Sequence, residues 1–319
     1  MLAANAGAFW YLERFTPDWG RYLHWRKWDL LFAEAPNGPV DWLVLGDSSG
    51  SLGVVAETLQ EELGGSALNL CTTAGGTLLD DLWLLDSYIR RHGPPGNVVL
   101  VHTFSVWHKS PNTEAVATAP LLWLLTQGIQ PHPFVGLGMA NLKPFFMKYF
   151  PLYNQSHRLA GLFMPPWEQP WFKNPLAERS TAAGTLALEK AYPEKVARQL
   201  GQLLADYKSA SKPPAAFNLA CLRRLLDLSQ RHRLPVYLAN GPLAADLLAH
   251  APIQEQIAVI HRGLDALLPQ YPLAQRVLHR PLPFATEELV DQVDHLRHPA
   301  ARLYTQRLAA AIRRAGTAR

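Results

Sequence analysis

A short apolar run that ends in a small polar turn constrains the fold of this chain most. Trp42–Gly46 is apolar, and Asp47, Ser48 and Ser49 follow it directly. Continuous apolar runs of this length are typical of buried parallel strands, which often lead straight into a helix. The carboxyl ends of such strands gather at one edge of the sheet, where the next helix presents its first N–H groups. The sequence therefore predicts that Ser48 lies at that edge.

The same alternation of apolar runs and helical patterns recurs along the chain. Further strands are predicted at Ala67–Cys71, Asn97–Thr103, Pro235–Ala239 and Arg276–His279. Helices are predicted over Leu52–Leu63, Leu78–Arg91, Phe217–His232, Ile253–Leu268 and Pro299–Arg314. Strands that alternate with helices form parallel sheets covered on both faces. The predicted fold is therefore a three-layer α/β/α sandwich around a five-stranded parallel sheet.

Composition excludes several classes of protein. The chain has 319 residues, of which 48% are hydrophobic and 18% charged, so a globular core is expected and a disordered or coiled-coil chain is not. The net charge is +4 without a run of basic residues, so no nucleic-acid partner is predicted. Cys71 and Cys221 lie in apolar stretches and are interpreted as buried thiols. No apolar stretch has the length of a membrane span, although the first ten residues fit the end of an anchor.

Regularity stops between the third strand and residue 215. The interruption, Val106–Pro214, is an insertion, and Leu186–Ser209 within it has helical character. An excursion of this length between two strands of one sheet is expected to border the functional site. It contains the tryptophans Trp107, Trp123, Trp167 and Trp171, whose faces suit sugar rings. The predicted organisation is an arm over 1–40, a sheet domain over 41–105 and 215–319, and the insertion over 106–214.

The N-terminal arm mixes aromatic and basic side chains, which allows two interpretations. Such a mixture suits a bilayer interface, so the arm is a candidate for binding a membrane surface or a membrane protein. It equally suits an arm packed over the sheet. The residues concerned are Trp10, Tyr11, Arg14, Trp19, Arg21, Tyr22, Trp25, Arg26, Lys27 and Trp28.

Two later segments complete a pattern with the Gly46-Asp47-Ser48 turn. One is Asn69–Gly76, which follows the second strand, and the other is Asp291–Leu296, which precedes the last helix. Together they resemble the blocks of the SGNH (GDSL-type) hydrolase superfamily, in a divergent branch similar to cell-envelope proteins of polysaccharide O-acetylation. The resemblance implies a flavodoxin-like fold, with Ser48 as nucleophile and His295 as base.

The oxyanion hole and the orienting carboxylate depart from the family pattern. The resemblance implies that Gly75, with Gly76 as a near match, and the Ser48 amide supply the hole. The block after the third strand lacks the family's asparagine, and Ser105 or Thr103 is the candidate substitute.

The family's aspartate stands three residues before the histidine, where this chain has Gln292. Either Asp294 or Asp291 is a candidate to orient His295, and Asp294 is preferred. Asp47, His102 and Trp107 are predicted to contact substrate, although a histidine at the end of a buried strand is more often a core residue.

These residues predict serine-dependent ester hydrolysis or acyl transfer by a Ser-His-Asp triad, with O-acetyl groups on a glycan as the expected substrate. No cofactor is expected, and no metal either, because His108, His132, His157 and His298 lack ligand spacing. The expected partner is an acylated carbohydrate or another ester, and the expected location is the cell envelope, with the cytoplasm as alternative. A catalytically inactive scaffold that binds glycan, a membrane surface or a partner acyltransferase is the alternative function.

Overall fold

The computed structural model describes residues 3–8, 19–34, 38–109, 180–207 and 211–317. The chain divides into two compact units, of which one contains residues 1–26 and 111–178 and the other contains residues 27–110 and 179–319. The second unit carries the sheet and every contact considered below. None of the described helices is both long and apolar enough to cross a membrane.

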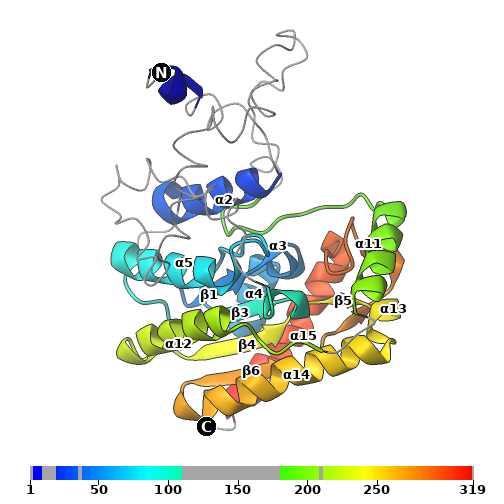
Figure 1. Ribbon diagram of the computed structural model, residues 1–319. Coiled ribbons are helices and arrows are strands. Elements are labelled where there is room, and N and C mark those ends of the chain that lie inside the picture. The colour runs from blue at the N-terminus through cyan, green and yellow to red at the C-terminus, as the bar shows by residue number, and fades with distance from the viewer. Residues whose placement is uncertain (1–2, 9–18, 35–37, 110–179, 208–210, 318–319) are drawn as a thin grey trace. The chain divides into compact units, whose positions relative to one another are not determined.

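The second unit is built on one sheet of five parallel strands, in the order β2-β1-β3-β4-β6 (Figure 1). The strands are β1 Trp42–Gly46, β2 Ala67–Asn69, β3 Asn97–His102, β4 Val236–Asn240 and β6 Ala274–Leu278. This is the flavodoxin-like order, in which the chain starts inside the sheet and adds strands on both sides. The predicted fold class is confirmed.

Helices cover both faces of the sheet. The chain moves one way from β1 to β2 and the other way from β2 onward, so right-handed crossovers place the connecting helices on opposite faces. Helices α3, α4 and α15 pack together, and α5 packs against α12. The helices of this layered unit are α3 Ser48–Gly53, α4 Ala56–Leu63, α5 Thr77–His92, α11 Pro193–Asp206, α12 Ala216–Arg231, α13 Ala245–Leu248, α14 Ala251–Leu267 and α15 His298–Thr317.

The observed elements differ from the predicted ones in two instructive places. The single helix predicted over Leu52–Leu63 is two helices, because Val54 and Val55 adopt extended backbone angles between α3 and α4. A second, two-stranded parallel sheet of β5 (Leu243–Ala244) and β7 (Pro283–Phe284) was not predicted. Strands of two residues are too short to show any periodicity.

The end of the N-terminal arm is packed against the sheet unit. The fully buried Lys27, near the end of α2 (Trp19–Asp29), donates from Nζ to the carbonyl oxygens of Asn69 (2.8 Å) and Gly184 (2.6 Å). The ring of Trp28 packs edge-on against Trp83, with centroids 4.8 Å apart. The contacts of Lys27 and Trp28 agree with the interpretation in which the arm packs over the sheet. Trp10, Tyr11 and Arg14 lie outside the described residues.

Candidate active site

The site predicted from the sequence falls at the topological switch point of the sheet. Strands β1 and β3 are neighbours, but the chain leaves β1 toward β2 and leaves β3 toward β4. Ligands of open α/β sheets bind in the crevice that this divergence creates at the carboxyl ends of the strands. Ser48 follows β1 there, and Ser105 follows β3.

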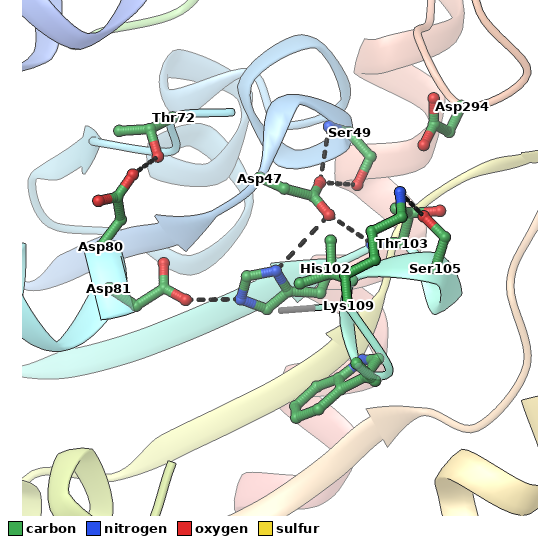
Figure 2. A network of polar contacts seen from close by, with 12 residues as sticks. Asp47, Ser49, Thr72, Asp80, Asp81, His102, Thr103, Ser105, Lys109 and Asp294 are labelled. Carbon is green, nitrogen blue, oxygen red and sulfur yellow. Dashed lines mark hydrogen bonds and ion pairs between the residues drawn. The ribbon is translucent and has the colours of Figure 1, made fainter. Parts of the chain in front are cut away.

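Asp47 joins the two strands at this point (Figure 2). Its Oδ1 accepts hydrogen bonds from the Ser49 amide (2.8 Å) and hydroxyl (2.5 Å), and its Oδ2 accepts one from the Thr103 amide (2.8 Å). The side chain caps α3 and is 1% exposed. Both oxygens are therefore committed inside the protein, and the prediction that Asp47 contacts substrate is wrong.

Gly46 lets the chain turn from β1 into this cap. Its φ is +147°, and a Cβ there would lie 1.9 Å from the carbonyl oxygen of Val101 on β3. A side chain at position 46 would therefore push β1 away from β3. The same carbonyl accepts the Asp47 amide at 3.2 Å, which fixes the direction in which the turn leaves the strand.

Ser48 is the first residue of α3 and is 9% exposed. Within the described part of the chain, neither its hydroxyl nor its amide forms a hydrogen bond to another residue. The groups that a nucleophile and an oxyanion hole require are thus not consumed by the fold around them.

His295 lies in a tight loop that ends just before α15. Leu289 and Leu296 form an isolated antiparallel bridge, and the Val290 amide donates to the carbonyl oxygen of His295 (2.7 Å). The loop is therefore folded back on itself. As a result, Asp291 Oδ1 lies 2.8 Å from His295 Nδ1.

The other acidic residue of the loop faces the opposite side of the imidazole ring. Asp294 Oδ1 is 3.9 Å from His295 Nε2. Asp291, not Asp294, therefore holds Nδ1, and the preference for Asp294 as orienting residue is wrong on this geometry. The sequence left both open because the loop closure that decides between them depends on backbone hydrogen bonds.

The charge of Asp47 contributes to the electrostatics of this loop. Burial lowers the pKa of His295, but the hydrogen bond to Asp291 and the charges of Asp294 and Asp47 outweigh it, so the pKa is raised. Burial raises the pKa of Asp294, against the charge of His295. Although burial acts the other way, the hydrogen bond with His295 lowers the pKa of Asp291.

His102 and Trp107 are buried, and the contacts of both side chains lie inside the protein. His102 Nε2 lies 2.7 Å from Asp81 Oδ2, and its Nδ1 lies 3.6 Å from Asp47 Oδ2. The Trp107 ring packs edge-on against His102, with centroids 5.7 Å apart, and is 4% exposed. The predicted substrate contacts of both residues are wrong, and His102 is the core histidine of the alternative interpretation.

Asp81 is a residue that the sequence reasoning missed. It lies on α5, fully buried, at helical spacing from the buried Leu78 and Leu85. An acidic residue in the apolar stripe of a helix requires a partner inside the protein. That signal was present in the sequence.

The segment after β2 supplies the glycines expected at the oxyanion hole. The Thr72 amide donates to the carbonyl oxygen of Gly46 (2.8 Å), so this segment runs beside the turn that leads to Ser48. Gly75 is partly exposed in the turn that follows. A Cβ at Gly76 would lie 2.0 Å from Asp80 Oδ2, so a side chain there would displace the carboxylate that accepts a hydrogen bond from Thr72 Oγ1 (3.0 Å).

Ser105 follows β3 in a 3-10 turn, Phe104–Val106. Its Oγ accepts a hydrogen bond from Lys109 Nζ (3.0 Å), as Figure 2 shows. A hydroxyl that accepts one hydrogen bond can still donate its own proton. Ser105 therefore keeps the donor that its predicted role requires.

The end of the insertion contacts the His295 loop. Gln199 on α11 donates from Nε2 to Gln292 Oε1 (3.2 Å) and accepts from the Val293 amide (2.7 Å). The Tyr192 amide, just before α11, donates to the carbonyl oxygen of Val290 (2.5 Å). The insertion thus borders the candidate site, while Trp123, Trp167 and Trp171 lie outside the described residues.

No family model matches this chain, and no curated protein is detectably similar to it. Within the described ranges, no group of three or more histidine, cysteine or acidic side chains could hold a metal ion. The assignment of function therefore depends on the geometry of the chain itself and on the resemblance of its motifs.

Proposed function

We propose that this chain is a serine-dependent esterase or acyltransferase that acts through an acyl-enzyme. The observation that carries the proposal is the buried His295, oriented by Asp291 at 2.8 Å, in a loop whose charge environment includes Asp47, the residue before Ser48. A nucleophile, a base and an orienting carboxylate are the parts that serine hydrolysis needs.

The contact with Asp291 assigns the role of each imidazole nitrogen. A carboxylate accepts a hydrogen bond from Nδ1–H, so the neutral ring carries its proton on Nδ1 and Nε2 is the basic atom. Asp291 stabilises the imidazolium that forms when Nε2 takes up a proton. Asp294, 3.9 Å from Nε2, adds negative charge on that side.

The reaction then proceeds in two balanced steps. Ser48 Oγ attacks the ester carbonyl carbon while its proton passes to His295 Nε2, and the carbonyl oxygen becomes an oxyanion near the Ser48 and Gly75 amides. The alcohol leaves with the proton from Nε2, which gives the acyl-enzyme. Water or a sugar hydroxyl then attacks the acyl carbon and gives its proton to Nε2. The bond between the acyl carbon and Ser48 Oγ breaks, Oγ takes the proton from Nε2, and the acid or the new ester leaves.

The raised pKa of His295 predicts the pH dependence of this reaction. The base must be neutral to accept a proton, and its folded pKa lies above the ordinary value of 6.5. As the pH is lowered, activity should therefore begin to fall while the pH is still above 6.5, because the imidazole already becomes protonated in that range.

We further propose an O-acylated carbohydrate, such as an O-acetylated glycan of the cell envelope, as the substrate. The support is the tryptophan-rich insertion, whose described end contacts the His295 loop, together with the resemblance to O-acetylation proteins. Transfer to a sugar hydroxyl and hydrolysis by water use the same residues.

One observation favours the inactive scaffold as a second candidate. Ser48 is buried, with 9% of its surface exposed, so an ester would have little access to its hydroxyl. A scaffold would keep the fold and bind glycan or a partner acyltransferase without covalent chemistry.

A fluorophosphonate probe separates the two candidates, because it labels only an activated serine. The full chain should be labelled and should hydrolyse p-nitrophenyl acetate, and Ser48→Ala should lose both by about 1000-fold or more. The matched control is Ser51→Ala, whose buried hydroxyl lies in the same helix and has no hydrogen-bond partner among the described residues. An unlabelled wild-type chain would support the scaffold.

A further inference from the structure

We propose that His102 is a positioning residue of the candidate site, a buried imidazolium that is held by Asp81 and both orients and neutralises Asp47 beneath Ser48. The catalytic part of this inference rests on the serine mechanism proposed above. The structural part does not, because it concerns charges that exist with or without a reaction.

The geometry is a line of three titratable groups that come from three different elements. Asp81 comes from α5, His102 from the end of β3, and Asp47 from the end of β1 (Figure 2). The distances are 2.7 Å from Asp81 Oδ2 to His102 Nε2 and 3.6 Å from His102 Nδ1 to Asp47 Oδ2. All three side chains are at most 2% exposed. Water therefore screens these charges very little.

The two flanking carboxylates keep the imidazole charged. Burial alone lowers the pKa of His102, but Asp81 and Asp47 together raise it to about 10. Burial likewise opposes ionisation of Asp47, yet the interaction with His102 lowers the pKa of that carboxyl. At neutral pH, His102 is an imidazolium and Asp47 a carboxylate.

The other titratable groups around the line do not supply this positive charge. Asp80, also on α5, adds negative charge near Asp81. Cys71 and Tyr304 are neutral, since burial raises the pKa of both well above its ordinary value. Lys27 acts on Cys71 and donates to main-chain carbonyls.

The position of Asp47 explains why neutralising it matters. Its charge raises the pKa of His295, and it directly precedes the residue whose hydroxyl would attack. Left uncompensated, that charge would oppose the oxyanion and keep the base protonated. His102 reduces both effects and fixes the carboxylate that caps α3, so it acts through Asp47 and never touches substrate.

The test uses two variants of the full chain, which should shift the pKa of His295 in opposite directions. His102→Gln removes the compensating cation, so the pKa of His295, followed by NMR of the imidazole resonances, should rise by about 0.5–1 unit. Asp47→Asn removes the negative charge, so the same pKa should fall by a similar amount. The control His232→Gln, at an exposed position at the end of α12, should leave it unchanged.

If His102→Gln does not fold, Asp81→Asn provides a second test, in which the pKa of His102 itself is measured. Without that carboxylate the pKa of His102 should fall toward its ordinary value, and the pKa of His295 should change less than in His102→Gln, because a negative and a positive charge are lost together. In the wild-type chain the His102 resonances should stay those of an imidazolium from pH 6 to about pH 9. A wild-type His102 that titrates below pH 8, or two variants that shift His295 in the same direction, would overturn the inference.

The result is independent of activity. If the fluorophosphonate probe fails to label Ser48 but the opposite shifts are observed, the serine mechanism fails and the charge arrangement stands. If the chain is active, the acid limb of its kcat/KM profile should move with the His295 pKa in each variant. A structural role alone would lower activity without moving that limb.

Discussion

Two histidine–aspartate pairs lie near one edge of this sheet, and they differ mainly in the burial of the carboxylate. His102 and Asp81 are 2.7 Å apart, and the Asp81 side chain is 0% exposed. His295 and Asp291 are 2.8 Å apart, but the Asp291 side chain is 34% exposed. At nearly equal distances, the roles we propose for the two pairs differ: a fixed charge for the enclosed pair and proton exchange for the pair in the loop. The surroundings, more than the hydrogen bond itself, decide what such a pair does.

The largest effect is expected when the carboxylates of the loop are neutralised by substitution. Asp291→Asn should reduce kcat on p-nitrophenyl acetate by about 10³–10⁴-fold, because Nδ1 loses the group that fixes the tautomer and stabilises the imidazolium. Asp294→Asn, at 3.9 Å from Nε2, should change kcat by less than about tenfold. If the two effects were reversed, Asp294 would be the orienting residue and the loop pair would have been misassigned.

A second challenge concerns the enclosed pair and uses stability in place of activity. The folded pKa of His102 is raised to about 10, so its contribution to stability is complete below the unfolded value near 6.5 and is lost as the pH rises toward 10. The free energy of unfolding should fall by about 1–3 kcal/mol between pH 7 and pH 9, because one extra bound proton in the folded state gives a slope of at most about 1.4 kcal/mol for each pH unit. Urea unfolding measures this fall, and it should be clearly smaller in His102→Gln, where His295, whose pKa is also raised, still contributes. An equal fall in the variant would show that another group is responsible.

The smallest expected effect tests how the loop pair is held. Gln199→Ala removes the two hydrogen bonds that α11 makes to Gln292 and Val293, so kcat should fall by about tenfold and amide exchange should rise across residues 290–295. The enclosed His102 pair should not respond. Gln202→Ala, at an exposed position of the same helix, is the matched control. Unchanged exchange in the loop would mean that α11 does not hold it.

The sequence predicts the enclosed region better than the loop, for a physical reason. Apolar runs such as Trp42–Gly46 and Asn97–His102 must be buried, and strands that alternate with helices have few ways to pack, so the fold class follows. Ser48 and His102 reach the switch point because their strands end there. The local sequence pattern is therefore sufficient to predict this part of the structure.

The partners of the two histidines depend on tertiary contacts that local pattern does not encode. Asp291 reaches His295 only because the Val290 amide closes the loop onto the His295 carbonyl. Asp81 reaches His102 only once α5 has packed on the sheet. Spacing along the chain cannot report either distance. The sequence therefore favours Asp294 over Asp291 as the partner of His295 and does not indicate Asp81 as the partner of His102.

The buried Lys27 has a consequence for how this protein can be shortened. A fragment that begins at residue 41, where the predicted sheet domain starts, would contain all five strands but would lack the ammonium bonded to the carbonyl oxygens of Asn69 and Gly184. Those oxygens would have to find water where Lys27 had filled the space, and the amide of Asn69, which donates to the carbonyl oxygen of Ala183 (2.8 Å), would have to hold β2 to that turn without the ammonium. A crystallisable or assayable fragment should therefore start before Lys27, however complete the sheet looks without it.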